Sequence, residues 1–390
     1  MRIVRILEQT VPLASKIRNA VIDFSQMTAS IVAVVTDIRR DGRPVIGFGF
    51  NSNGRYGQAG ILRERIIPRV MAAEPGALLD EAGTNLDPFR VWQVAMSNEK
   101  PGGHGERSVA VGTLDMAIWD AVAKIEERPL AHVLAQRFGF GTPEASVEVY
   151  AAGGYYHPDK GLDGLREELR SYLGLGYDAV KMKVGGASMA EDLSRIEAGL
   201  SVVGDGSRLA IDANARFDPE TAIEFARAIE PYDLKWFEEP VDPLDYLGHA
   251  RVAAACSTPI ATGENLFSAV DARNLARHGG LDPERDTIQV DPVLSYGLVE
   301  YLRVLEHMKE FGWSRRRFVP HGGHQFALHC AAGLRMGGNE SYPHVFAPFG
   351  GFADDDSIEH GRVRLPDAPG IGIELKGDLH ALYLKLLDTV

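Results

Sequence analysis

Hydrophobic and polar positions follow two different rhythms along this chain, and the change falls near residue 140. The early part has alternating, strand-like runs at 31–38 and 44–50, and the polar stretch 51–58 separates them from the sequence that follows. Residues 108–125 then place apolar side chains at helical spacing and end close to Lys124. Strand-like runs followed by a helical region predict an antiparallel α+β domain over residues 1–140.

From residue 141 onward, short apolar runs alternate with longer amphipathic stretches such as 189–204. A strand and a helix that repeat eight times predict an α/β fold, a (β/α)8 TIM barrel, over residues 141–365. Residues 366–390 do not fit another barrel unit and are expected to return to the first domain. The eight strand-like runs are 147–154, 177–186, 208–214, 234–240, 258–265, 286–292, 316–323 and 343–351.

Composition and charge narrow the classes of function. The 390 residues are 45% hydrophobic and 24% charged, as in ordinary globular proteins. A formal net charge of -13 argues against a nucleic-acid groove, which usually has a basic excess. Two widely spaced cysteines, Cys256 and Cys330, predict no disulfide framework and favour a reducing cytoplasm. The charged N-terminus predicts no secretory signal, and no run approaches the roughly 20 apolar residues of a membrane span.

Carboxylates close three consecutive strand-like runs. Asp212, Glu238 and Glu264 are separated by 26 positions each, which is one β-α unit. In a barrel these side chains would meet at the C-terminal rim, where active sites of this fold lie. Oxygen ligands without His or Cys favour Mg²⁺ over Zn²⁺, so we predict a magnesium site. We prefer Glu238 over its neighbour as the ligand because adjacent strand residues point to opposite sides. The polar neighbours Asn214, Glu239 and Asn265 are expected to support this site or the substrate.

Two lysines, Lys181 and Lys183, stand two positions apart on the second predicted strand and therefore share one face. Lysine pairs on an open sheet usually face solvent, but this strand is apolar and should be buried. Mutual repulsion and burial are expected to lower the pKa of both amines toward that of a useful general base.

His321 ends the seventh predicted strand, and Asp291 ends the sixth. The aspartate is placed to bind one ring nitrogen of His321 and fix its tautomer. His324 is a further candidate, either to support this pair or to contact the substrate. Lysine and histidine would then face each other across a metal-bound carboxylate. This arrangement predicts removal of the proton next to that carboxylate. If the next carbon carries a hydroxyl, a protonated group on the other side can help it leave, and the product is a 2-keto acid.

These motifs together resemble the mandelate racemase and muconate lactonizing branch of the enolase superfamily. The motifs that carry the resemblance are KMK at 181–183, the DAN, WFEEP and GEN segments, the Asp291 and His321 pair, and the helical stretch 111–130. The resemblance implies an α+β capping domain, completed by the C-terminal segment, over a modified barrel. It also implies Mg²⁺ as the cofactor and assembly into a homo-oligomer.

Three further segments, 97–108, 149–158 and 319–334, resemble members of this branch that dehydrate D-tartrate to oxaloacetate. That likeness implies a small hydroxy-dicarboxylate as the substrate. It implies that Lys183 takes the α-proton, Lys181 tunes it, and His321 protonates the departing hydroxyl. It also implies that Lys100 reaches the distal carboxylate of the substrate.

One feature departs from the family pattern. Many relatives place a glutamate at the end of the eighth strand, whereas the run 343–351 offers no acid and Glu340 falls too early. We therefore expect another group, or the metal alone, to serve there. Specificity should come from capping-domain loops, among which we favour Asn53 and Tyr56. The full set of polar candidates is Lys16, Arg18, Asn51, Asn53, Arg55 and Tyr56.

Two alternatives stay open. A racemase, an epimerase or a dehydratase of another hydroxy acid could use the same base and acid. A barrel that binds a metal and a ligand without turnover would need only the carboxylates, and the complete set of base, acid and ligands argues against it.

Overall fold

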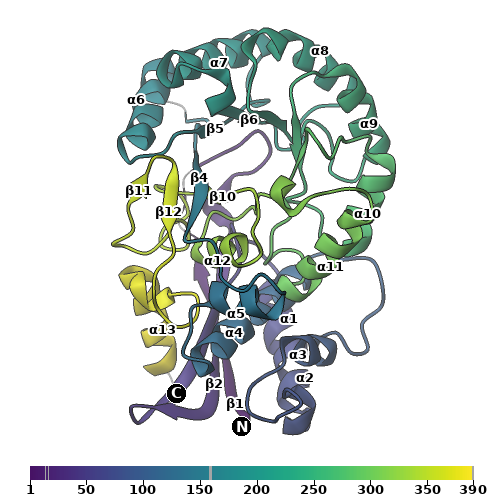
Figure 1. Ribbon diagram of the computed structural model, residues 1–390. Coiled ribbons are helices and arrows are strands. Elements are labelled where there is room, and N and C mark those ends of the chain that lie inside the picture. Colours follow the sequence, from purple (N-terminus) through teal and green to yellow (C-terminus); the bar gives the residue numbers. More distant parts are fainter. Residues whose placement is uncertain (14, 16, 158–159, 389–390) are drawn as a thin grey trace.

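The computed structural model describes residues 1–13, 15, 17–157 and 160–388 of the chain. An N-terminal sheet with its helices lies at one end of the molecule, and an arc of helices surrounds parallel strands at the other (Figure 1). Both ends of the chain lie at the end formed by the N-terminal sheet, away from that arc. No described helix is long and apolar enough to cross a membrane.

The N-terminal domain is built on a three-stranded antiparallel sheet in the order β1-β2-β3. The central part of β2 is fully buried, because α4 packs across one face of the sheet and covers both β2 and β3. This is the antiparallel α+β arrangement that the alternating runs predicted. The elements are β1 (Ile3–Pro12), β2 (Thr28–Arg40), β3 (Arg43–Phe50), α1 (Gln58–Ile61), a π-helical turn (Leu62–Ile66), α2 (Ile67–Met71), α3 (Pro88–Ala95), α4 (Arg107–Ile125) and α5 (Leu130–Arg137).

Helix α4 is buried on all sides because it packs against both the sheet and the barrel. A Cβ at Gly49 of β3 would lie 2.4 Å from the carbonyl oxygen of Thr113, so only glycine allows this approach. On the barrel side, Asp115 accepts a hydrogen bond of 2.6 Å from the backbone N–H of Leu298 and so caps α11. Burial raises the pKa of Asp115 to about 8. The helix therefore ties the capping domain to the barrel.

We expect Gly112→Ala to destabilise the protein, because its Cβ would lie 1.7 Å from the carbonyl oxygen of Val293 in the barrel. Such overpacking typically costs about 1–3 kcal/mol of the free energy of unfolding, which urea titration would measure. Gly60→Ala in α1 is the matched control, since no heavy atom lies within 4 Å of its added Cβ. Equal stability of the two variants would contradict the close contact.

The second domain is a modified (β/α)8 barrel, which confirms the predicted fold class. Parallel strands follow one another in the order β4-β5-β6-β7-β8-β9, and β10 pairs with β4. The seventh position is a single parallel bridge between Ile288 and Phe318. The strands are β4 (Ser146–Ala152), β5 (Val180–Lys183), β6 (Leu209–Asp212), β7 (Trp236–Glu238), β8 (Ile260–Thr262), β9 (Thr287–Ile288) and β10 (Asn339–Ser341).

Helices cover the barrel, and all of them except the last, which packs beside α5, form the arc visible in Figure 1. Most begin at a capping side chain; Ser188, for example, accepts from the backbone N–H of Glu191 at the start of α7. These helices are α6 (Gly161–Gly174), α7 (Met189–Val203), α8 (Pro219–Ile229), α9 (Tyr246–Ala255), α10 (Ala269–His278), α11 (Leu298–Lys309) and α12 (Gln325–Gly333).

The eighth strand is not where the hydrophobic pattern placed it. The predicted run 343–351 is a loop, and the strand is the polar segment Asn339–Ser341. All three of its side chains are fully buried, and they form polar contacts such as that of Ser341 Oγ with the hydroxyl of Tyr177, 2.7 Å away. A strand whose polar side chains are buried against other elements has no apolar signature, so periodicity did not reveal it.

The C-terminal residues contact both domains. The hairpin of β11 (Ile358–Glu359) and β12 (Arg362–Arg364) adds to β4 in antiparallel fashion. Helix α13 (Gly377–Asp388) then packs on β1 and β2 of the N-terminal sheet. The hydroxyl of Tyr383 donates to the carbonyl of Gly49 at 2.7 Å, which seats the helix on β3.

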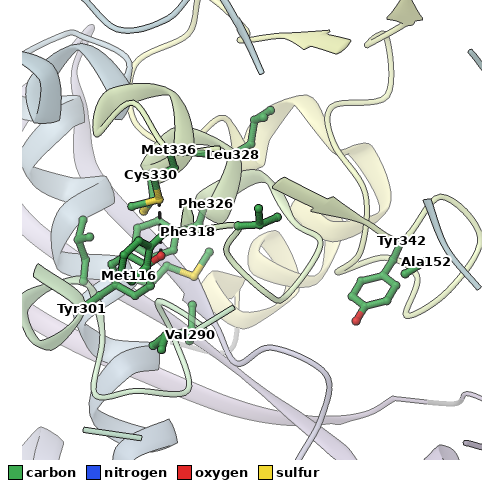
Figure 2. Close-up of a cluster of buried hydrophobic side chains, with 14 of the residues drawn as sticks. Met116, Ala152, Val290, Tyr301, Phe318, Phe326, Leu328, Cys330, Met336 and Tyr342 are labelled. Carbon is green, nitrogen blue, oxygen red and sulfur yellow. Dashed lines mark hydrogen bonds between the residues drawn. The ribbon is translucent and has the colours of Figure 1, made fainter. Parts of the chain in front are cut away.

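The core between α4 and the barrel contains sulfur and aromatic side chains. Figure 2 shows Met116 of α4 beside Tyr301 of α11 and Phe326 of α12. The hydroxyl of Tyr301 lies 3.5 Å from the sulfur of Met336. Cys330 belongs to this cluster, and both cysteines are buried free thiols.

Candidate active site

Three carboxylates meet at the C-terminal ends of the barrel strands. Asp212 ends β6, Glu238 ends β7 and Glu264 follows β8, and one oxygen from each lies within 4.8 Å of the others. Parallel pairing brings the first two level, because Asp212 and Glu238 are register partners. The first two are fully buried and the third is half-buried.

The electrostatics of this cluster call for a cation. Burial, reinforced by the charges of Asp212 and Glu264, raises the pKa of Glu238 to about 8 even though Lys181 opposes the shift. Oxygen-only donors, crowded and partly buried, are the set that a hard divalent ion prefers. The residues present therefore fit Mg²⁺.

Lys181 and Lys183 project from β5 into this cluster. The amine of Lys183 lies 2.5 Å from Asp212 Oδ2, and that of Lys181 lies 2.5 Å from Glu238 Oε1 and 2.7 Å from Glu340 Oε1. Burial alone would lower the pKa of each amine, but these carboxylates outweigh it and raise both pKa values. The expectation of lowered pKa values is therefore wrong for this structure, because the opposing charges come from other strands.

Glu340 also corrects the sequence interpretation. It lies on β10, fully buried, and accepts a hydrogen bond from the backbone N–H of Gly322 at 3.1 Å. Its other oxygen contacts Lys181, and its carboxylate comes within 3.8 Å of His321 Nε2. An acid therefore does occupy the eighth strand, and it appeared to fall too early only because that strand was placed at 343–351.

His321 faces the carboxylates from the opposite side. Its Nδ1 lies 2.8 Å from Asp291 Oδ2, and its Nε2 lies 3.2 Å from Glu264 Oε2 and 3.0 Å from Asn53 Nδ2. Burial would lower the pKa of His321, but Glu264, Glu340 and Asp291 together raise it to about 9. These carboxylates favour the protonated imidazole, which is the form that can act as an acid.

His324 is placed behind this pair rather than in front of it. Its Nε2 lies 2.7 Å from Ser52 Oγ, and its Nδ1 accepts from the backbone N–H of Ala327 at the start of α12. Burial lowers the pKa of His324 to about 4, so the ring is neutral. Both ring nitrogens are engaged, which suits the first of the two expected roles, support of the pair, rather than contact with the substrate.

A cavity of about 510 Å³ opens above the carboxylates. Asn265 organises its floor, donating from Nδ2 to both oxygens of Glu239 at 3.0 and 3.1 Å and to Glu264 at 3.3 Å. Asn214 donates to Asp212 Oδ2 at 3.3 Å. The predicted residues that line the cavity are Lys183, His321, Glu264, Asn53, Asn214, Glu239, Asn265 and Arg55.

Other predicted capping-domain residues lie elsewhere. Lys100 is exposed and does not line the cavity, and Tyr56 is 58% exposed outside it. Arg18 pairs with Asp23 at 2.8 Å, and Asn51 is buried against the backbone N–H of Ser30. Lys16 lies outside the described residues. Of the two loop residues favoured from sequence as substrate contacts, Asn53 lines the cavity and Tyr56 lies outside it.

Several residues of the site were not among those predicted from the sequence. Trp236 and Gln289 donate to Glu238 Oε2 at 2.9 and 2.8 Å, and the ring of Tyr155 lies 5.1 Å from the amine of Lys183. The hydroxyl of Tyr342 lies 3.3 Å from His321 Nε2. Trp236 and Gln289 each precede a site carboxylate by two positions, so strand periodicity would have placed them on the same face.

Comparison with known proteins agrees with this geometry. The family model described as "Enolase C-terminal domain-like" matches residues 164–379, more than half of the chain. The chain belongs to the enolase superfamily. The resemblance to its mandelate racemase and muconate lactonizing branch is thereby confirmed. L-talarate/galactarate dehydratase of Salmonella typhimurium strain LT2 is 31% identical to this superfamily member over 370 residues, covering 93% of this chain and 86% of that protein.

Solved structures resemble this enolase-superfamily chain over nearly its whole length. A racemase from Streptomyces coelicolor A3(2) with bound magnesium is 25% identical with a TM-score of 0.75, covering 94% of this chain and 95% of that one. L-talarate dehydratase from Polaromonas sp. JS666, complexed with Mg and L-glucarate, is 26% identical with a TM-score of 0.73, covering 97% and 96%. Magnesium is therefore confirmed as the cofactor.

Proposed function

We propose that this chain is a magnesium-dependent acid-sugar dehydratase, a carbon-oxygen lyase, and that its substrate is D-tartrate, which it converts to oxaloacetate and water. The observation that carries the proposal is the order of groups across the cavity floor. Lys183 contacts Asp212, and His321 contacts Glu264, so a base and an acid stand on opposite sides of one carboxylate cluster.

We assign the metal to Asp212, Glu238 and Glu264. Bound there, Mg²⁺ would supply positive charge to the substrate carboxylate as the α-proton leaves and would oppose the attraction of Asp212 for the Lys183 ammonium. The neighbouring residues hold these ligands in place. Trp236 and Gln289 orient Glu238, and Asn265 orients Glu264.

The base is Lys183. Its amine takes the α-proton, and the electron pair of the broken C–H bond moves toward the substrate carboxylate. Lys181 stays charged between Glu238 and Glu340 on the same face of β5, which adds a fixed positive charge beside the base. That charge opposes the effect of Asp212 and favours the neutral form of Lys183.

The acid is His321. Asp291 fixes the tautomer and holds the proton on the ring, and His321 Nε2 points toward the carboxylate cluster. Transfer of that proton to the β-hydroxyl breaks the C–O bond and releases water. The electron pair left by the α-proton forms the C=C bond of an enol, which becomes the 2-keto acid on protonation at carbon.

A panel of acid sugars tests the substrate. Tartrate isomers, galactarate, talarate and arabinonate would each be supplied with Mg²⁺, and 2-keto acids would be detected. The likeness of segments 97–108, 149–158 and 319–334 to D-tartrate dehydrating relatives supports oxaloacetate from D-tartrate as the expected product. Turnover of galactarate but no tartrate isomer would reject the tartrate assignment and retain the dehydratase.

The second candidate is a racemase or epimerase, and the opposed base and acid favour it equally. The similarity to a racemase of Streptomyces coelicolor also supports it. Incubation in deuterated water separates the two. A racemase would exchange the α-proton for deuterium without forming a keto acid. The dehydratase would show α-proton exchange and would also form the keto acid.

Metal removal should abolish activity, and Mg²⁺ should restore it. Treatment with EDTA followed by metal titration would measure this dependence.

Glu264→Gln removes one charged ligand of the metal. It is expected to raise the Mg²⁺ concentration needed for half-maximal activity by about 100-fold or more. That is at or above the largest loss of metal affinity seen when a residue that only supports a ligand is changed. Glu220→Gln is the control, because Glu220 is exposed and pairs with Arg251. Full activity after EDTA treatment would contradict the metal assignment.

A further inference from the structure

The cavity contains a basic side chain without a carboxylate partner. Arg55 lines the cavity, and among the described residues no carboxylate oxygen lies within 4.0 Å of its guanidinium. Its Nη1 donates to the neighbouring carbonyl of Gly54 at 2.7 Å. The other basic side chains of the lining are already engaged: Lys183 with Asp212 at 2.5 Å, His321 with Asp291 at 2.8 Å and His104 with Asp271 at 3.2 Å.

The backbone of Arg55 is held firmly at the edge of the cavity. Its N–H donates to the carbonyl of Thr28 at 2.8 Å, and its own carbonyl accepts from the N–H and the hydroxyl of Thr28, each at 2.9 Å. Burial lowers the pKa of Arg55, while Asp291 and Glu264 oppose that shift. A guanidinium nevertheless keeps its charge in proteins. The cavity is therefore provided with a fixed cation that has spare hydrogen-bond donors.

Within the described part of the chain, the rest of the lining offers the far end of a dianion no unpaired basic group. Glu239, Asp242 and Asp271 all line the cavity, and the chain as a whole carries a net charge of -13. A substrate whose first carboxylate occupies the metal cluster still needs a partner for its second. A guanidinium binds a carboxylate through two parallel hydrogen bonds, which suits it to that task.

Resting on the proposed function, we propose that Arg55 binds the second carboxylate of a dicarboxylate substrate and so selects diacids over monoacids. Arg55 takes the role that the family resemblance implied for Lys100, whose side chain is exposed and outside the cavity lining. The selection acts through the charge and planar geometry of the guanidinium rather than through the base or the acid.

Binding of unreactive probes tests the assignment without turnover. Calorimetry would compare succinate with butyrate, a four-carbon diacid with a four-carbon monoacid, on the magnesium-loaded protein. The wild type should bind succinate about 10- to 100-fold more tightly, as expected for charge-assisted hydrogen bonds. Arg55→Met should lose that preference, and Arg55→Lys should keep part of it. Arg63→Met is the control, because Arg63 is exposed and pairs with Glu8 at 2.6 Å.

Three outcomes would overturn the proposal. They are a wild type with no preference for succinate, an Arg55→Met variant that keeps the preference, and a Lys100→Met variant that loses it while Arg55→Met does not. Thermal unfolding of each variant shows that a loss of binding is not a loss of fold. Because succinate and butyrate do not react, failure of the dehydratase proposal would appear in the acid-sugar panel and failure of the Arg55 assignment in calorimetry.

Discussion

The Lys183→Ala variant is expected to lose both α-proton exchange and dehydration, with rates reduced by about 10²- to 10⁴-fold, the usual contribution of a positioned general base. The methyl group of alanine cannot accept a proton, and the nearby amine of Lys181 is held between Glu238 and Glu340. Oxaloacetate formation from D-tartrate and deuterium incorporation at the α-carbon would measure the two activities.

Two controls make the Lys183 experiment decisive. Lys309→Ala removes an exposed lysine at the end of α11 and should leave both rates unchanged. Thermal unfolding of Lys183→Ala in the presence of Mg²⁺ would show whether Asp212, which loses its 2.5 Å partner, still allows the barrel to fold. A folded Lys183→Ala protein that dehydrates at the wild-type rate would exclude Lys183 as the base.

The His321→Asn variant should separate the two halves of the reaction. Asparagine keeps a polar side chain next to Asp291 but cannot act as the acid that protonates the departing hydroxyl, so dehydration should fall by about 10²- to 10⁴-fold. Lys183 and its contact with Asp212 are untouched, so α-proton exchange should persist. The ratio of exchange to keto-acid formation, measured in deuterated water, reports this uncoupling.

The alternatives for His321 give different ratios. Equal loss of exchange and dehydration would mean that His321 supports the base side of the site or the metal ligand Glu264, 3.2 Å away, rather than the leaving group. Unchanged dehydration would reject its role as acid. His278→Asn, at the exposed end of α10, is the control and should behave as the wild type in both assays.

The proposed catalytic residues and the proposed specificity residues come from different domains. Lys183 and His321 come from barrel strand ends, whereas Arg55 and Asn53 come from the loop after β3. Helix α4 holds the two domains together through Asp115 and the close approach at Gly112. A change at Arg55 can therefore alter which acid is bound without removing a contact of the base or the carboxylates, whereas Asn53 lies 3.0 Å from His321 Nε2.

The sequence alone brought the candidate metal ligands and the candidate base and acid to one rim of the barrel. Asp212, Glu238 and Glu264 each close an apolar strand at intervals of one β-α unit, and parallel strands bring such ends to one rim. Lys183 and His321 were predicted in the same way. The placement of these side chains follows from sequence because side-chain alternation and unit length are local properties that a barrel converts directly into position.

The tertiary structure alone decided the charges and the partners. Asn339–Ser341 forms the eighth strand, and its buried polar side chains find partners on other elements, which no apolar pattern records. Glu340 thereby enters the site beside Lys181. The pKa of Lys183 is raised rather than lowered because Asp212 from the adjacent strand lies 2.5 Å away. Arg55 lines the cavity, whereas Lys100 is exposed outside it. Burial and electrostatic interaction depend on neighbours that are distant in the chain, so only the folded structure could determine them.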